Sequence, residues 1–373
     1  MDRKLFLRLV AAAILLIIHA PFAHAQSGTL IFTSGFESST TISAPQDCWS
    51  TPSVGCWAVL SGTDNTTGYS WGAPLWGSQY TYGGGSVALL IADVPGATPA
   101  EIGDYLSDRI VTTRRHNGDW NNQAFYSENS SAKNGQNPKE YSVTQEEVNF
   151  FPMSEPGDLY MSYWIRFQPG MIENMLGLDT SQVGATTNGG TWRSFFAFKT
   201  GTNASAGSAP LDNGDYRVEA YVLTGCSYDQ ITAQIPPCTG SNPNPAPFWM
   251  VNGDNVAGGS YALVNNWSEL NSAIPVPDDG SWNKFEVFWH RSSGSDGRFW
   301  MAINGAQLVN HIGPNMGQAS MSINRIMPEL LYTGGHYPIY QWIDDIQIWD
   351  GGFPPSTCTP GVEYWCDPPY ASH

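Results

Sequence analysis

Arg217, Glu219 and Tyr221 are the residues whose types and spacing could do chemistry together. They alternate along 215–223, a run with the period of a β-strand, so all three project from one face. A guanidinium can neutralise an anionic group, a carboxylate can accept a proton, and a phenol can donate one. The alternative is a surface ion pair between Arg and Glu, which has no catalytic role.

His290 lies at the end of a second strand-like run, 284–291. Phe285, Val287 and Trp289 alternate with polar or aromatic residues there, so one side faces a core and His290 belongs to the other side. If that side forms a concave surface, His290 and Tyr337 could meet the Arg217 strand. The alternative is a packed structural histidine at a strand end.

Paired carboxylates for glycoside hydrolysis are not found in the expected spacing. The pattern E-x-D-x-x-E on one strand is absent from the sequence. Asp344 and Asp345 form a doublet, but adjacent residues on a strand point to opposite faces and so do not flank one bond. Hydrolysis by that mechanism is therefore not expected.

The elements that must position these residues are almost all strands. Period-two patterns bounded by Gly, Asn, Asp and Ser predict ten of them, at 29–33, 56–60, 86–92, 158–167, 192–199, 215–223, 284–291, 298–305, 323–332 and 340–349. The pattern predicts an all-β fold, a two-sheet antiparallel β-sandwich of jelly-roll type with long loops. No internal repeat supports a propeller. The segments 71–85 and 114–154 are expected to be irregular.

The segment 71–85 is rich in Gly and aromatic rings. Its rings could stack on the apolar faces of sugars while polar neighbours meet the hydroxyl groups. The residues expected to do so are Trp71, Trp76, Tyr80 and Tyr82. Burial in the core is the alternative for each ring.

The first 25 residues have the pattern of a secretion signal. A basic start precedes the apolar run 9–18 and an Ala-His-Ala cleavage site at 23–25. The remaining chain is expected to form one sandwich domain, 26–350, followed by a Cys-stapled tail, 351–373. No stretch is long and apolar enough to predict a membrane span. The protein is expected to be secreted, to an extracellular or periplasmic location.

The net charge of −17 limits the partners. A chain this acidic is a poor nucleic-acid binder, so no nucleic acid is expected. Charged and aromatic residues each make up 13% of the chain, which suits an extracellular β-protein.

The six cysteines fall into three close pairs. In an exported protein this spacing favours three local disulfides over metal binding, since no C-x-x-C spacing occurs. The expected pairs are Cys48 with Cys56, Cys226 with Cys238, and Cys358 with Cys366.

Several of these segments together resemble a known superfamily. The chain resembles the concanavalin A-like lectins and glucanases in four segments: Ser34-Gly-Phe-Glu, Tyr160-Met-Ser-Tyr-Trp-Ile-Arg-Phe, the Trp-His strand and Trp342-Ile-Asp-Asp-Ile-Gln-Ile-Trp. Within this superfamily the chain resembles the jelly-roll polysaccharide lyases, which include alginate, glucuronan and heparin lyases. Arg217-Val-Glu219-Ala is similar to their R-x-E-L motif. Phe288-Trp-His290 is similar to their Q-I-H motif but lacks its Gln, and Tyr332-Thr-Gly-Gly-His-Tyr337-Pro-Ile is similar to their Y-x-A-G-x-Y-x-Q motif but lacks its final Gln.

The resemblance implies β-elimination on a uronic-acid glycan. It assigns Arg217, His290 and Tyr337 to catalysis, and Glu219, Tyr221 and His336 to substrate binding. Similar sandwiches also hold a structural Ca²⁺ between the first and last strands, which here would use Glu37 and Asp344 or Asp345. The alternative for these acids is a solvated pair.

The sequence thus predicts a secreted protein that engages polysaccharide, as a lyase or as a non-catalytic glycan-binding or surface-structural protein on the same scaffold.

Overall fold

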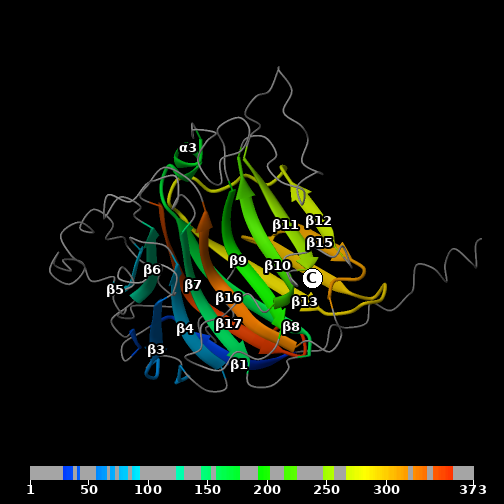
Figure 1. The fold of residues 1–373 in the computed structure, drawn as a ribbon, viewed down its shortest axis with the longest axis horizontal. Coiled ribbons are helices and arrows are strands. Elements are labelled where there is room, and N and C mark those ends of the chain that lie inside the picture. Colours follow the sequence, from blue (N-terminus) through cyan, green and yellow to red (C-terminus); the bar gives the residue numbers. More distant parts are fainter. Residues whose placement is uncertain are drawn as a thin grey trace, which may run out of the picture.

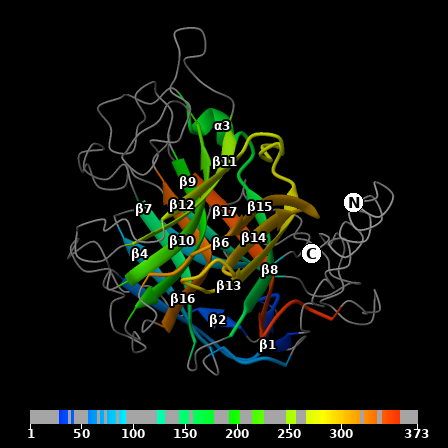
Figure 2. The same ribbon diagram turned by 90° about the vertical axis from the view of Figure 1, so that its right-hand side faces the viewer.

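The computed structural model describes residues 28–36, 40–42, 56–64, 68–71, 75–82, 86–92, 123–129, 144–152, 157–176, 192–201, 214–224, 247–255, 266–317, 322–333 and 339–355. These residues form two antiparallel sheets packed as a sandwich (Figures 1 and 2). The predicted all-β, two-sheet architecture of jelly-roll type is confirmed.

One sheet has eight strands. β1 (Thr29–Ser34) pairs with β17, and the remaining order is β15 (Ala306–Ile312), β14 (Arg298–Ile303), β13 (Trp282–His290), β8 (Leu159–Phe167), β17 (Ile339–Asp350), β6 (Gln123–Asn129) and β5 (Ser86–Ala92).

The other sheet has nine strands. Their order is β12 (Trp267–Asn271), β11 (Phe248–Asn255), β10 (Gly214–Leu223), β9 (Trp192–Gly201), β16 (Ser322–Thr333), β7 (Thr144–Pro152), β4 (Leu75–Tyr82), β3 (Cys56–Ser61) and β2 (Thr41–Ile42). In Figure 1 the labels of β10, β9, β16, β7 and β4 follow one another across this sheet.

The core lies between the sheets and follows from strand alternation. On β13, Phe285, Val287 and Trp289 point into it. From the opposite sheet, Phe195 of β9 meets Phe285 and Phe198 of β9 meets Trp289. The rings of Phe198 and Trp289 stack with centroids 5.3 Å apart. Burial of such rings is the main favourable contribution to folding. The face of each sheet that points away from the core is called its outer face below.

A buried arginine links the two sheets. Arg193 of β9 is fully buried and donates hydrogen bonds to Gln341 and the carbonyl of Tyr340, both on β17, and to Gln168 just after β8. Its guanidinium also lies 5.5 Å from the ring centroid of Phe167. Because a buried charge is costly without partners, these contacts fix the two sheets relative to each other.

Two segments that the sequence predicts to be irregular contain strands. β4 lies within 71–85, and β6 and β7 lie within 114–154. β4 pairs with β3 on one side and β7 on the other, so backbone hydrogen bonds from two neighbours hold a segment of weak pattern. The prediction of irregular structure there is wrong because strand pairing outweighs local propensity.

Helix contributes little to the described chain. The one labelled helix, α3 (Met171–Asn174), follows β8. No helix among the described residues has the length and apolar character needed to cross a membrane.

Candidate functional site

The outer face of the nine-stranded sheet carries the charged residues singled out in the sequence. On β10, Tyr216, Val218 and Ala220 belong to the core, so Arg217 and Glu219 point away from it. Tyr221 follows the same alternation and packs with apolar residues of β10 and β11 outside the core cluster. The prediction that Arg217, Glu219 and Tyr221 share one strand face is confirmed.

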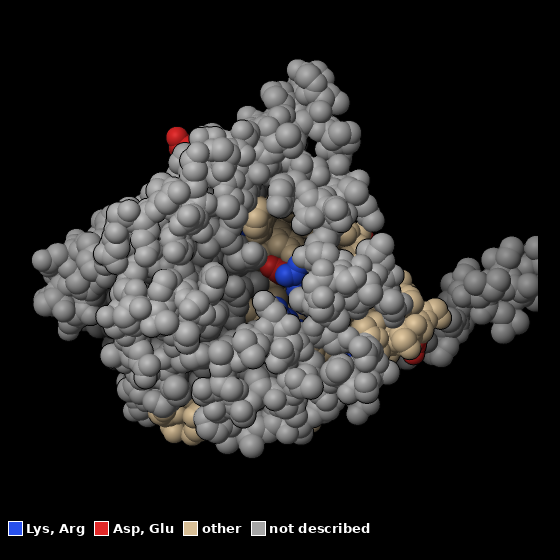
Figure 3. Space-filling view, viewed as in Figure 1, with Lys and Arg blue, Asp and Glu red and all other residues tan. Residues whose placement is uncertain are grey.

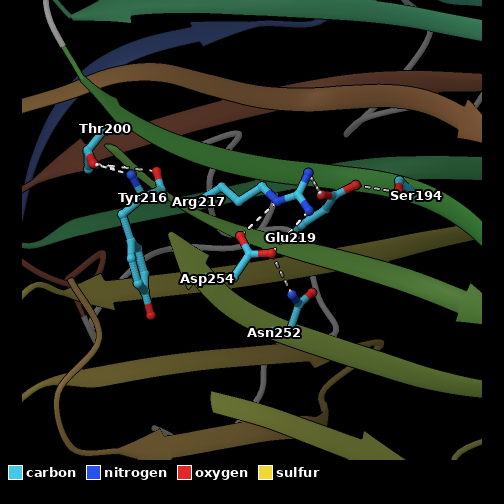
Figure 4. A network of polar contacts seen from close by, with 7 residues as sticks. All are labelled: Ser194, Thr200, Tyr216, Arg217, Glu219, Asn252 and Asp254. Atoms are coloured by element: carbon cyan, nitrogen blue, oxygen red, sulfur yellow. Dashed lines mark hydrogen bonds and ion pairs between the residues drawn. The ribbon is translucent and has the colours of Figure 1, made fainter. Parts of the chain in front are cut away.

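Arg217 is held by two carboxylates (Figure 4). Its Nε lies 2.8 Å from Oδ1 of Asp254 and its second terminal nitrogen 3.1 Å from Oδ2, which is a two-pronged contact with the neighbouring strand β11. The remaining terminal nitrogen lies 3.2 Å from Oε2 of Glu219. The pairing of β10 with β11 places Arg217 directly opposite Asp254.

Three further polar residues surround this clamp. Ser194 of β9 donates its hydroxyl to Glu219, and Asn252 of β11 donates its amide to Asp254 at 3.5 Å. Lys199 of β9 is the register partner of Arg217, on the side away from Asp254. Residues from three adjacent strands thus form one polar surface, the Arg217 cluster: Ser194, Lys199, Arg217, Glu219, Asn252 and Asp254.

The cluster is strongly shielded from solvent. Asn252, Asp254 and Glu219 are no more than 2% exposed, whereas the side chain of Arg217 is 19% exposed. Figure 3 looks onto the molecule in the orientation of Figure 1 and shows basic and acidic groups at the bottom of a hollow. A ligand that enters from solvent therefore meets Arg217 before the carboxylates.

Burial and charge shift the pKa values of three members of this face. Burial raises the pKa of Asp254 above its ordinary value, although Arg217 opposes the shift. Burial would lower the pKa of Arg217, but the charges of Glu219 and Asp254 outweigh it and raise that pKa. Burial, aided by the charge of Glu219, raises the pKa of the Tyr221 phenol, which therefore stays protonated at neutral pH.

His290 does not join this cluster. It ends β13 in the eight-stranded sheet, and it alternates with the core residues Val287 and Trp289, so it projects from the outer face of that sheet. Arg217 projects from the outer face of the other sheet. The expectation that His290 and Arg217 meet on one surface is therefore wrong, because their strands belong to opposite layers of the sandwich.

His290 instead takes part in a local acidic contact. Its Nδ1 lies 2.6 Å from Oδ1 of Asp158 and its Nε2 lies 3.8 Å from Oδ2 of Asp296. The hydrogen bond with Asp158 raises the pKa of His290, while partial burial opposes the shift. Folding therefore makes His290 hold its second proton more tightly than it does in the unfolded chain.

This contact predicts a pH dependence of stability. A histidine whose pKa is raised by folding stabilises the fold fully below its unfolded value of about 6.5, and this contribution disappears as pH rises through the folded value. Because the imidazole is 36% exposed, we expect less than about 1 kcal/mol. Urea unfolding from pH 6 to pH 9 should show the loss in the parent and not in His290→Gln. If the free energy of unfolding changed equally with pH in both proteins, the raised pKa of His290 would be contradicted.

The aromatic residues expected to stack on sugars have different positions. Trp71 is buried in the core, where its ring lies 5.0 Å from that of Phe32 and stacks on Phe36 at 5.4 Å. The expectation of a sugar contact for Trp71 is thus wrong in this structure. Trp76, Tyr80 and Tyr82 lie in β4, all at even-numbered positions of the strand, and their side chains are outside the described part. His336 and Tyr337 also lie outside the described residues.

The proposed metal ligands are only partly described. β1 pairs with β17, so the first and last strands do lie together as expected. Asp344 is fully buried and accepts a hydrogen bond from the amide of Asp345, whose φ of 48° accompanies a register shift in β17. Glu37 lies outside the described residues, and the residues that are described contain no group of three or more His, Cys, Asp or Glu placed to hold a metal.

The cysteine pairing is likewise not described. Cys56 begins β3, and its side chain is outside the described part. The other five lie outside the described residues altogether: Cys48, Cys226, Cys238, Cys358 and Cys366.

Sequence reasoning missed four members of the Arg217 cluster. Asn252 and Asp254 alternate with Trp249 and Val251 in 248–255, a period-two pattern that could have revealed a strand with one polar face. Ser194 and Lys199 lie in a predicted strand, but nothing local shows that this strand neighbours β10.

No protein-family model and no curated protein matches the chain. Solved structures do match it. The endo-β-1,4-glucuronan lyase from the fungus Trichoderma reesei has 10% identity and a TM-score of 0.39, covering 78% of this chain and 93% of that one. The alginate lyase Aly36B has 12% identity and a TM-score of 0.32, covering 72% and 98%.

Domain 4 of AbnA, an extracellular arabinanase of family GH43 from Geobacillus stearothermophilus, also matches, at 12% identity and a TM-score of 0.33, covering 89% and 97%. The matched structures thus include an alginate lyase, a glucuronan lyase and a domain of an arabinanase.

Proposed function

We propose that the protein binds polysaccharide on the outer face of its nine-stranded sheet. The observation that carries this proposal is the Arg217 cluster itself. Glu219, Asp254 and Lys199 are buried on a sheet face that is not the core, and burying charged groups is rarely the most stable choice for a structural surface. Carboxylate, amide and guanidinium groups are also the side chains that fix polar ligands by hydrogen bonding.

A polymer that contains uronic acid is the ligand class that we favour. Lys199 and Arg217 are cations at paired positions on neighbouring strands, so both lie near the same point of the surface. They could together meet one carboxylate of the ligand. The net charge of −17 repels a polyanion, which makes these local cations necessary for its binding.

The same residues could support β-elimination. Lys199 and Arg217 would neutralise the uronate carboxylate, which makes the proton on the adjacent ring carbon acidic. The carboxylate of Glu219 or of Asp254 would take that proton. Asp254 is a stronger base than an ordinary aspartate, because burial raises its pKa. The carbon–oxygen bond would break as the carbon–carbon double bond forms, and the Tyr221 phenol would protonate the leaving oxygen. This scheme does not use His290.

One experiment separates the catalytic proposal from the binding proposal. Purified protein is titrated with alginate, glucuronan and polygalacturonan by calorimetry, and the same mixtures are followed for the ultraviolet absorbance of an unsaturated product. Binding with rising absorbance supports a lyase. Binding without it supports a non-catalytic glycan-binding protein on this scaffold. Absence of binding to all three polymers, with a neutral glucan as control, would remove the proposed function.

We also propose that the protein is exported with three local disulfides. The support is the signal pattern of residues 1–25 and the close spacing of each cysteine pair. Intact mass after expression with the leader in a secreting host should correspond to a chain that begins at Gln26 and lacks six hydrogen atoms. Peptide mapping should then find Cys48–Cys56, Cys226–Cys238 and Cys358–Cys366. A free thiol or a pair across distant segments would contradict the proposal.

A structural Ca²⁺ is proposed between β1 and β17, bound by Glu37 with Asp344 or Asp345. The support is the pairing of these two strands and the two adjacent carboxylates, Asp344 and Asp345, that β17 carries. A ligand of the folded state alone stabilises it by about 2.7 kcal/mol at a hundredfold excess over its dissociation constant. The melting temperature should fall with chelator, recover with Ca²⁺ more than with Mg²⁺, and stop responding in Asp345→Ala. A parent protein whose melting ignores the chelator would contradict the site.

A further inference from the structure

Asn252 has one polar atom that the fold leaves unused. Its side chain is fully buried on the outer face of the nine-stranded sheet, where Asn252 pairs in register with Glu219 and lies next to Asp254 (Figure 4). Its Nδ2 donates to Oδ2 of Asp254, but its Oδ1 has no hydrogen-bond partner among the described residues. A buried acceptor without a donor costs about 1–3 kcal/mol, so this atom weakens the fold.

The chemistry of the neighbours fixes which atom is unused. Asp254 is a carboxyl acceptor, and the amide nitrogen is the Asn252 group that can donate to it. The opposite orientation would place two oxygens together. The free position is therefore an acceptor, and only a group with an O–H or N–H can satisfy it.

We propose that Oδ1 of Asn252 accepts a hydrogen bond from a ring hydroxyl of the bound glycan, and so makes Asn252 a specificity-determining residue. This inference rests on the proposed polysaccharide site. A carboxylate cannot satisfy Oδ1, because an ionised carboxylate only accepts. The ligand must therefore present its carboxylate to Lys199 and Arg217 and an unsubstituted hydroxyl to Asn252.

The consequence is a preference between two forms of one polymer. O-acetylation replaces the hydroxyl donor by an ester that can only accept, so an acetylated polymer leaves Oδ1 unsatisfied in the complex. A site built to hydrogen-bond a hydroxyl discriminates strongly against an analogue that lacks it, because its buried polar group then stays unpaired. The proposed ligand is thus a uronic-acid polysaccharide whose hydroxyl groups are free where it contacts β11.

The test uses alginate, glucuronan and polygalacturonan, each deacetylated and each chemically O-acetylated, with the parent, Asn252→Leu and Asn252→Ala. We expect the parent to bind the deacetylated form of its best polymer about tenfold more tightly than the acetylated form, the effect of one hydrogen bond. Both variants should bind the deacetylated form about tenfold more weakly than the parent. The variants should bind the deacetylated and acetylated forms equally, because the hydrogen bond between Oδ1 and the hydroxyl group is already lost when Asn252 is replaced.

Stability separates this role from a structural one. Because Asn252→Leu removes an unpaired acceptor, its melting temperature should equal or exceed that of the parent. The matched control is Asn315→Leu, which removes another fully buried asparagine whose Nδ2 donates to the carbonyl of His290 and whose Oδ1 accepts from the amide of Ser292. This control should melt at a lower temperature and keep the parent's affinity and its preference.

Each outcome decides a different claim. If the Asn252 variants retain the parent's affinity, or still prefer the deacetylated polymer as the parent does, the role of Asn252 is overturned while the polysaccharide site stands. The role of Asn252 is also overturned if Asn252→Leu melts at a lower temperature, as the control does, and binds the polymer with the parent's affinity. If the parent binds neither form of any polymer, the proposed function is overturned and this inference with it.

Discussion

Replacement of Arg193 by Ala is expected to lower the free energy of unfolding by about 3 kcal/mol or more. The substitution removes the donor shared by the buried side-chain oxygen of Gln341 and the partly buried carbonyl of Tyr340, and it also removes the donor to Gln168. The loss of a donor to a buried acceptor costs about 1–3 kcal/mol. The substitution also removes the contact between the guanidinium and Phe167. Because single domains are stable by only about 5–15 kcal/mol, this is a large part of the total.

Chemical denaturation at neutral pH measures this loss. The control is Arg298→Ala, since Arg298 is only partly buried, and its contacts in the described part of the chain are an exposed hydrogen bond to Asn310 and the face of the Phe288 ring. That variant should lose less than about 1 kcal/mol. Equal losses in the two variants would show that Arg193 does not hold the sheets together.

Replacement of Arg217 by Met is expected to cost both stability and ligand binding. It leaves Glu219 and Asp254, each no more than 2% exposed, without the cation that both contact. Breaking a buried ion pair from one side costs about 3–5 kcal/mol. Binding of the best uronic-acid polymer should fall at least tenfold, because Arg217 is also the exposed cation of the cluster.

The pH dependence of this loss has a definite sign. Burial already raises the pKa of Asp254 in the parent, and removal of the cation that opposes this shift should raise it further. An acid whose pKa is raised by folding stabilises the fold when protonated, and that contribution is lost as pH rises through the folded value. The deficit of Arg217→Met should therefore be large at pH 7 to 8 and small near pH 4.

A double variant checks that charge causes the effect. Adding Asp254→Asn to Arg217→Met removes one unpaired carboxylate, so it should restore part of the stability without restoring polymer binding. Denaturation at two pH values and calorimetry with the polymer measure the two quantities. Two results together would contradict this explanation. The loss of unfolding free energy in Arg217→Met would not depend on pH, and the losses of the two single substitutions would add in the double variant; lost packing, not charge, would then be the cause.

The sequence was sufficient for the strands that form the centre of the fold. The period-two pattern of 284–291 correctly predicts β13 and its core residues Phe285, Val287 and Trp289. The same alternation correctly places Arg217, Glu219 and Tyr221 on one face of β10. Both results depend only on geometry within a single strand.

What failed depends on the arrangement of strands in space. Alternation indicates that His290 and Arg217 each point away from a core, but not which sheet each strand joins, and they occur in different sheets. Asp254 becomes the partner of Arg217 through the register of β10 with β11, across 37 residues of sequence. Such pairings are set by tertiary structure, and no local pattern contains them.

The most direct test of the proposed site is a crystal structure of the protein with a bound oligosaccharide from the polymer that it binds best. We predict that the oligosaccharide lies across β9, β10 and β11, with a carboxylate against Arg217 and Lys199 and a hydroxyl within hydrogen-bond distance of Oδ1 of Asn252. An oligosaccharide on the outer face of the eight-stranded sheet, near His290, would contradict the account.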